Sequence, residues 1–287
     1  MKLLAIAMLL SGLVGAADSP GPSAGKVFGQ EAKPLSGDVR KYSWPRRDLH
    51  VSIGSTKMAP ALALGSWAAF HGSGSQTMAM GDLVLLESEV NPVIRELQAG
   101  GFEILAVHNH LLSESPHVLY VHFMGHGEEA ALGRTLAGAL EKTRTPRESA
   151  ASATPSPEET KVFDAFQAAL GQKGSTAGTV LQIGVPRRDP ITDGGMEIPP
   201  SMGMAESINA EVSGGRVAAT GDFVLVADEV NPVIRELQSH GIDVTALHSH
   251  MLRENPRLFF MHFWTVGTPE KVGEGLKAAL SKIAIRQ

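Results

Sequence analysis

The pattern of apolar and polar positions predicts a strand–helix–strand–strand–helix unit in the first half of the chain. Residues 83–86 form a continuous apolar run, which is typical of a buried central strand. Val93, Ile94 and Leu97 then form one apolar stripe, so a helix is expected over residues 91–100, from an Asn-Pro pair to a Gly-Gly pair. Strands at residues 102–112 and 118–124, a turn at 113–116 and a helix at 128–142 complete the unit.

The same unit returns 140 residues later. The segment Glu89–Gln98 recurs unchanged as Glu229–Gln238, and more than half of residues 81–123 are identical to residues 221–263. We therefore expect an α+β fold made of two tandem ferredoxin-like repeats, packed about a pseudo-twofold axis. The expected boundaries are a first repeat over 26–142, a Pro-, Ser- and Ala-rich linker over 143–157 and a second repeat over 158–287.

The N-terminus has the composition of a secretory signal peptide. Lys2 precedes an apolar run, and the small residues at 14–16 suit cleavage before Ala17. We expect a signal peptide at 1–16, a flexible leader at 17–25, and an exported protein that is periplasmic or secreted. No later segment is apolar enough over ~20 residues to predict a transmembrane span in the mature chain.

Composition narrows the chemistry. The chain has 287 residues, a formal net charge of −5 and no basic tail, which argues against a nucleic-acid partner because phosphate binding needs clustered Lys and Arg. It has no cysteine, so a metal site would have to use His, carboxylate or Met side chains. Nothing in the sequence sets the oligomeric state.

Each repeat carries three histidines at matching positions. They are His108, His110 and His122 in the first repeat, and His248, His250 and His262 in the second. Residues two apart on a strand share a face, so the His-x-His pairs point the same way. A hairpin centred near Ser115 would place His108 opposite His122 and bring three imidazoles together, which predicts a metal site in each repeat.

Glu89 and Glu229 are the expected acidic neighbours of these histidines. If a parallel crossover joins the strands, each glutamate would lie at the sheet edge that carries the imidazoles. Its role would then be a metal ligand, a general base or a group that orients an imidazole. Asp82 and Asp222 each follow a glycine, and a turn hydrogen bond is the favoured interpretation for both.

A resemblance to a known family rests on four segments. Gly-Asp-Leu-Val-Leu, Glu-Val-Asn-Pro-Val, His-Asn-His-Leu-Leu-x-Glu-x-Pro and Tyr-Val-His-Phe resemble the LppY/LpqO-like family of exported bacterial proteins of unknown function. The resemblance covers essentially the whole mature chain and implies an exported, repeated domain without an assigned reaction. The anchoring cysteine of the lipoprotein members is missing here.

Three functions are consistent with the sequence. The first is an exported protein that binds a divalent transition metal (Zn, Cu, Fe, Ni or Mn) through the six histidines. The second is a metal-dependent hydrolase or oxygenase, acting on a small molecule or a cell-envelope component, with Glu89 or Glu229 as base. The third is a metal-free module whose histidine-lined cleft binds a small polar ligand or a partner protein.

Overall fold

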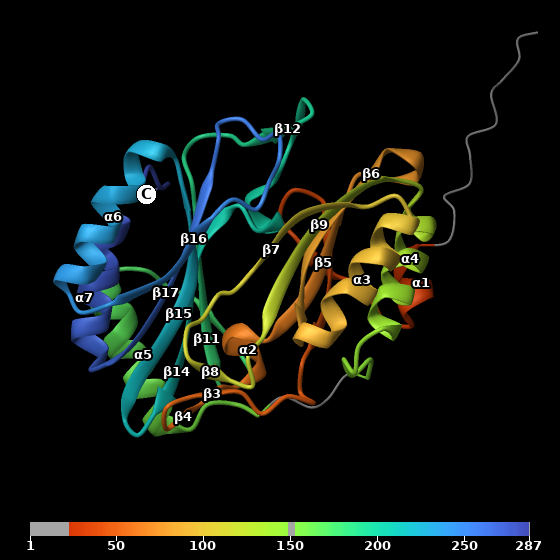
Figure 1. Ribbon diagram of the computed structural model, residues 1–287. Helices are drawn as coiled ribbons and strands as arrows, with labels where there is room; N and C mark the ends of the chain where they lie inside the picture. Colours follow the sequence, from red (N-terminus) through yellow and green to blue (C-terminus); the bar gives the residue numbers. More distant parts are fainter. Residues whose placement is uncertain (1–22, 149–152, 287) are drawn as a thin grey trace, which may run out of the picture.

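The computed structural model describes residues 23–148 and 153–286, and shows two similar halves packed side by side (Figure 1). Residues 1–16, the expected signal peptide, lie outside the described residues. The flexible leader expected over residues 17–25 extends too far, because a short helix, α1, already begins at Ala24.

The first half is built around a six-stranded antiparallel sheet of order β1-β2-β5-β6-β9-β7. Its elements are α1 (Ala24–Phe28), β1 (Lys33–Leu35), β2 (Val39–Pro45), β3 (Ser52–Ile53), β4 (Thr56–Lys57), α2 (Pro60–Ala63), β5 (Gly65–His71), η1 (Gly74–Gln76), β6 (Thr77–Leu85), α3 (Glu87–Ala99), β7 (Glu103–His108), β8 (Glu114–Ser115), β9 (Leu119–Gly127) and α4 (Glu129–Glu141).

The second half repeats this arrangement with a sheet of order β10-β11-β14-β15-β17-β16. Its elements are α5 (Pro157–Leu170), β10 (Ser175–Ala177), β11 (Val180–Pro186), β12 (Thr192–Asp193), β13 (Met196–Glu197), η2 (Pro200–Met202), β14 (Ala205–Ser213), β15 (Arg216–Leu225), α6 (Ala227–Ser239), β16 (Asp243–His248), β17 (Phe259–Gly267) and α7 (Pro269–Leu280). The expectation of two tandem α+β repeats is confirmed.

The elements form four layers in the order helix, sheet, sheet, helix (Figure 1). Helices α1, α3 and α4 cover the outer face of the first sheet, and α5, α6 and α7 cover the outer face of the second. Successive residues of a strand point to opposite faces, so every strand contributes to two cores. In β6, Leu83 faces the helices whereas Val84 faces the other repeat.

Each repeat contributes one segment that packs against the sheet of the other repeat. Residues 49–64, which include α2, lie against the second sheet, where Asn209 Nδ2 donates to the Leu62 carbonyl at 2.9 Å. Residues 190–204 lie against the first sheet in return, and Ser201 Oγ donates to the Ser36 carbonyl at 2.7 Å. Because each segment completes the core of the opposite repeat, the inner faces of both sheets are buried.

Helix α3 begins four residues before the expected Asn-Pro start. Glu89 lies in its first turn and accepts a hydrogen bond from the Leu86 main-chain N–H at 2.9 Å, which satisfies one of the free donors at the helix start. Pro92 therefore lies inside the helix, where it cannot donate to the Ser88 carbonyl. The equivalent helix α6 begins at Ala227 in the same way.

The Gly-Asp pairs lie in the middle of central strands, so their interpretation as turns at strand starts is wrong. Gly81 and Gly221 are needed because a Cβ atom there would lie 2.2 Å from the Trp67 carbonyl oxygen and 2.0 Å from the Ser207 carbonyl oxygen, respectively. Each glycine allows the neighbouring strand to approach closely while the following aspartate points toward the other repeat.

Across residues 23–148 and 153–286, no helix combines the length and the apolar character needed to cross a membrane.

We predict that Gly81→Ala lowers the free energy of unfolding by about 1–3 kcal/mol or more, because the added methyl would overlap main-chain atoms that cannot move aside cheaply. Gly65→Ala is the matched control, since nothing lies within 4 Å of its added methyl. Urea unfolding of both variants measures the difference. Equal stability of the two variants would contradict the close approach at Gly81.

Candidate metal centre

The central strand pair of each sheet places an aspartate beside a histidine on the inner face. Asp82 of β6 pairs with His122 of β9, and Asp222 of β15 pairs with His262 of β17. Asp82, His122 and His262 are buried between the sheets, and Asp222 is half-buried. This antiparallel register fixes the two side chains next to one another on the face toward the other repeat.

The neighbouring edge strands deliver the remaining histidines in a register that differs from the expected hairpin. His108 pairs with Tyr120 rather than with His122, whose partner on β7 is Ala106. The hairpin is therefore centred at residue 114 instead of 115, and a bulge between Ile104 and Ala106 shifts the ladder again farther from the turn. The expected strand is also too long, because β7 ends at His108 and His110 follows it outside the strand.

All six predicted histidines nevertheless meet, and they meet in one place. The described part of the chain contains two sets of four histidines. Within each set, every histidine has one ring nitrogen that lies within 4.8 Å of a ring nitrogen of each of the other three. The first set contains His108, His110, His122 and His250; the second contains His108, His248, His250 and His262. The six residues are called the histidine cluster below. Each set contains the three predicted histidines of one repeat and one histidine of the other repeat, so the two expected sites lie together and share rings.

The closest ring pairs join the two repeats. The ring centroids of His108 and its repeat counterpart His248 are 3.6 Å apart. His110 lies 3.7 Å from His262, and His122 lies 3.7 Å from His250, so these two pairs exchange under the repeat symmetry. The pseudo-twofold axis therefore passes between His108 and His248, at the centre of the cluster.

Every member of the histidine cluster buries at least one ring nitrogen that has no hydrogen-bond partner among the described residues. The same holds for one carboxylate oxygen of Asp82 and one of Asp222. A buried polar atom without a partner costs about 1–3 kcal/mol. So many orphaned atoms at one place make the cluster a candidate ligand site.

Burial keeps the imidazoles neutral. It lowers the pKa of His108 to about 3, with a further contribution from nearby His248, and lowers the pKa of His248 to about 4. Burial holds the pKa of the other four rings well below the ordinary value. Neutral imidazole is the form that ligates metal ions, so the cluster is ready to bind a cation at neutral pH.

Second contacts orient some of the rings. His262 Nδ1 lies 3.0 Å from the Gly221 carbonyl oxygen and His108 Nδ1 lies 3.1 Å from the Asn109 carbonyl oxygen. A carbonyl accepts only from a protonated nitrogen, so in each ring Nε2 is left as the lone-pair donor. Both of these Nε2 atoms are among the orphaned nitrogens.

Asp82 and Asp222 are the acidic neighbours that the sequence interpretation missed. Asp82 Oδ2 lies 3.7 Å from His122 Nε2 and 3.9 Å from His110 Nε2. Asp222 lies 3.7 Å from His250 Nδ1 and 3.9 Å from His262 Nε2. Burial raises the pKa of both carboxyls well above the usual range, and Lys41 opposes this shift at Asp82. A cation bound between them would favour their ionised form.

The donor set suits a transition metal. His nitrogens bind zinc at about 2.0–2.1 Å, so tetrahedral ligand atoms lie roughly 3.4 Å apart. The 4.8 Å spread of each set means that the rings close in by about 1 Å or less around an ion. Four imidazoles with a nearby carboxylate are acceptable ligands for Zn, Cu, Fe, Ni or Mn.

Glu89 and Glu229 lie elsewhere, because each forms a buried ion pair with an arginine. Arg46 Nη1 lies 2.7 Å from Glu89 Oε2, and Arg187 Nη1 lies 2.7 Å from Glu229 Oε2. Each glutamate also accepts main-chain hydrogen bonds at the start of its helix. Their expected position over the imidazoles is therefore wrong: the pairs join the end of β2 to α3 and the end of β11 to α6.

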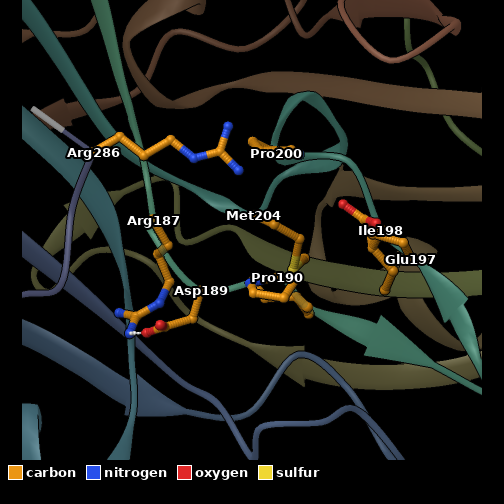
Figure 2. Close-up of a pocket in the computed structure, with 9 residues that line it drawn as sticks. Arg187, Asp189, Pro190, Glu197, Ile198, Pro200, Met204 and Arg286 are labelled. Carbon is orange, nitrogen blue, oxygen red and sulfur yellow. Dashed lines mark ion pairs between the residues drawn. The ribbon is translucent and has the colours of Figure 1, made fainter.

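Beside Arg187 lies a small cavity of about 10 Å³, room for about one water molecule. Figure 2 shows the Arg187 side chain directed toward Asp189 and away from Arg286. This cavity is too small for an organic ligand.

A much larger cavity, of about 510 Å³, lies between the two sheets. Its floor includes four members of the histidine cluster and both aspartates. Lys33, Lys41 and Trp67 line it from the first repeat, and Gln182, Ser207 and Asn209 line it from the second. A volume of this size is typical of small-molecule sites.

Comparison with known proteins identifies a family but no activity. A family model described as Domain of Unknown Function (DUF1259) matches residues 23–142 and again residues 164–282. No curated protein matches the chain at a significant level. Among solved structures, the trimeric bacterial microcompartment shell protein PduB is similar at 10% identity over 88% of this chain and 90% of that chain, with a TM-score of 0.21. A TM-score this low carries no argument about fold or function.

We predict that Glu89→Ala lowers the free energy of unfolding by about 3–5 kcal/mol, because it leaves buried Arg46 without its charge partner. Glu96→Ala, which removes the exposed partner of Lys142, is the control and costs less than about 1 kcal/mol. Bound metal per folded chain stays unchanged in both variants. If Glu89→Ala instead lost metal without losing stability, Glu89 would be part of the metal site.

We predict that His108 and His248 each contribute less stability to the metal-free protein as the pH falls from about 6.5 to about 4. In this window the unfolded chain protonates both rings, whereas the native rings, with pKa values of about 3 and about 4, stay neutral. At each ring the unfolded state binds more protons, so the contribution of that ring falls with decreasing pH by up to about 1.4 kcal/mol per pH unit, while the raised pKa values of Asp82 and Asp222 act in the opposite sense.

The double variant His108→Ala, His248→Ala removes two of these titrating rings and flattens the pH slope of stability by up to about 2.7 kcal/mol per unit. Urea unfolding with a chelator between pH 4.5 and 7 measures the slope. The control variant His126→Ala, His240→Ala changes one exposed histidine in each repeat and keeps the wild-type slope. A double variant with that same slope would show that His108 and His248 titrate normally in the native state.

Proposed function

The chain belongs to the family described as Domain of Unknown Function (DUF1259), a description that names no activity, and we propose that it binds one divalent transition-metal ion at the centre shared by its two repeats. The ion is held by imidazole nitrogens of the histidine cluster, with Asp82 or Asp222 as a carboxylate neighbour. Zn, Cu, Fe, Ni and Mn all fit this donor set.

The observation that carries the proposal is the set of orphaned imidazole nitrogens. Two overlapping groups of four nitrogens converge to within 4.8 Å, and members of both groups have no hydrogen-bond partner among the described residues. A metal-free pocket would leave the cost of these buried atoms uncompensated unless a ligand with several hydrogen-bond donors replaced the ion.

We propose one ion per chain because the two groups share rings. His108 and His250 belong to both groups, so two ions with four histidine ligands each would need both nitrogens of these two rings. Two ions, one per repeat, would instead require each repeat to rely on its own three histidines and its own aspartate.

A metal-dependent enzyme acting on a small molecule is favoured by a separate observation, namely that the large cavity ends on the histidine cluster. An open coordination position there would face the cavity. Glu89 and Glu229 are not the bases of this version, because Arg46 and Arg187 hold their carboxylates.

Three finer assignments belong to the same proposal. The four quoted segments support kinship with LppY/LpqO-like proteins, and residues 1–16 support export to the periplasm or beyond. The β6–α3–β7 crossover around β9 supports a ferredoxin-like origin of each repeat, extended by the preceding strands.

We predict that His108→Ala removes essentially all bound metal, because it takes a ligand from both groups of four. Mass-spectrometric metal analysis of the purified, folded chain gives the number of ions per chain. The control variant His126→Ala, His240→Ala keeps the wild-type content.

Two results would count against the shared centre. A wild-type content of two ions with half retained in His108→Ala indicates separate sites in the two repeats. A wild-type chain that takes up none of the five metals when each is supplied in excess shows that the cluster serves a metal-free function.

A further inference from the structure

We propose that the cavity between the sheets binds a small organic anion that carries hydroxyl groups, with its anionic group toward Lys41 and its hydroxyl groups toward the second repeat. This proposal rests on the metal centre for the cavity floor and adds the substrate class of the same site. It is carried by a difference between the two walls of an otherwise symmetric cavity.

Strand register identifies which residues of the two walls are equivalent. Trp67 pairs with Asp82 in the first sheet, and Ser207 pairs with Asp222 in the second, so Trp67 and Ser207 occupy the same position. By the same ladders, Lys41 corresponds to Gln182 and Met80 corresponds to Thr220. All six of these side chains line the cavity.

The two repeats contribute the same residue types to the floor of the cavity but different residue types to its walls. The histidines and aspartates are identical in the two copies. The first wall presents a cation, an indole and a thioether, and the second presents an amide and two hydroxyls. A symmetric metal centre therefore lies beneath a cavity that distinguishes the two ends of a ligand.

Lys41 supplies the charge of the first wall. Its ammonium lies 4.4 Å from the centre of the Trp67 ring, and no carboxylate lies within ion-pair distance of it among the described residues. Lys33 lines the same cavity and adds positive charge. A cation stacked on an aromatic face and directed into a partly desolvated cavity can pair with an incoming anion.

The charge of the loaded site also favours an anion. Two lysines and a divalent ion contribute four positive charges, and the two aspartates contribute two negative charges when ionised. The cavity then carries a net charge of about +2 and attracts anionic ligands. Both the metal and Lys41 are available to an oxyanion.

The second wall is suited to hydroxyl groups. Asn209 Nδ2 donates to the Leu62 carbonyl at 2.9 Å, and Gln182 Nε2 donates to the Ala61 carbonyl at 3.2 Å. With an amide N–H group engaged in each case, the amide oxygens are left to accept hydrogen bonds. Ser207 adds a hydroxyl that either donates or accepts.

The indole fixes the shape of the first wall. Trp67 packs so closely on Gly203 that a Cβ atom at this glycine would lie 3.2 Å from the ring. Gly203 belongs to the segment that the second repeat contributes to the first, so the ring is held by both repeats. An apolar ligand body can lie against the part of the indole that lines the cavity.

The test is a calorimetric titration of the metal-loaded full chain with salicylate, benzoate and citrate, and with the uncharged analogues salicylamide and benzamide. We expect the carboxylates to bind at least tenfold more tightly than their amides, with salicylate ahead of benzoate. Lys41→Gln, which installs the residue of the second repeat, should weaken carboxylate binding by roughly tenfold or more and leave the amides unchanged.

Lys57→Gln is the matched control, because Lys57 is exposed and does not line the cavity. Trp67→Ser tests the indole in the same assay, and should weaken benzoate more than citrate. Carboxylates that bind no better than their amides, or equally well to Lys41→Gln, would overturn the proposal, as would a failure of all three carboxylates to bind.

The same titrations on metal-free chain separate this proposal from the metal centre. If the wild type takes up no metal yet still prefers carboxylates through Lys41, the anion site stands and the metal proposal fails. If metal binds in the expected amount and Lys41→Gln has no effect, the metal centre stands and the anion site fails.

Discussion

The structure depends on six imidazoles and two carboxyls that lie, buried or half-buried, between two sheets that pack face to face. Nine of their nitrogen and oxygen atoms lack a hydrogen-bond partner in the described residues. At about 1–3 kcal/mol each, their cost is on the order of 10 kcal/mol, as large as the net stability of a typical domain. A bound transition metal contributes about 10–16 kcal/mol at a structural zinc site, enough to offset that cost. If the cluster binds a metal as proposed, metal binding and packing of the repeats are therefore coupled.

The pseudo-twofold axis explains why the histidines of both repeats meet in one cluster. In a symmetric arrangement, duplicated side chains that lie far from the axis form two separate sites. Duplicated side chains that lie on the axis form a single site. The close approach of His108 to His248 puts them on the axis. Hydrogen bonds from side chains to main-chain carbonyls hold the two repeats together there. Thr245 Oγ1 donates to the His110 carbonyl at 2.5 Å, and Asn109 Nδ2 donates to the Thr245 carbonyl at 3.2 Å. The centre thus exists only when the repeats are docked.

Sequence alone predicted the repeats and the histidines, because both are local patterns that a duplication displays twice. It could not predict the geometry between them. The hairpin is centred at residue 114 instead of 115, since His108 pairs with Tyr120, and nothing in the local pattern marks that centre. Glu89 was misplaced because its partner, Arg46, lies 43 positions away in the chain. Asp82 had an available signal, since a repeated Gly-Asp followed by an apolar run also fits a close approach inside a central strand.

Covalent duplication gives this fold an option that a symmetric dimer of identical chains lacks. In such a dimer, a substitution at one wall of the cavity appears at both walls. In a single chain, Lys41 and Gln182 occupy equivalent positions and differ, whereas His122 and His262 remain identical. The floor of histidines and aspartates can keep its symmetry while the walls come to distinguish the ends of an asymmetric ligand. The link between the repeats therefore has a chemical consequence beyond holding the sheets together.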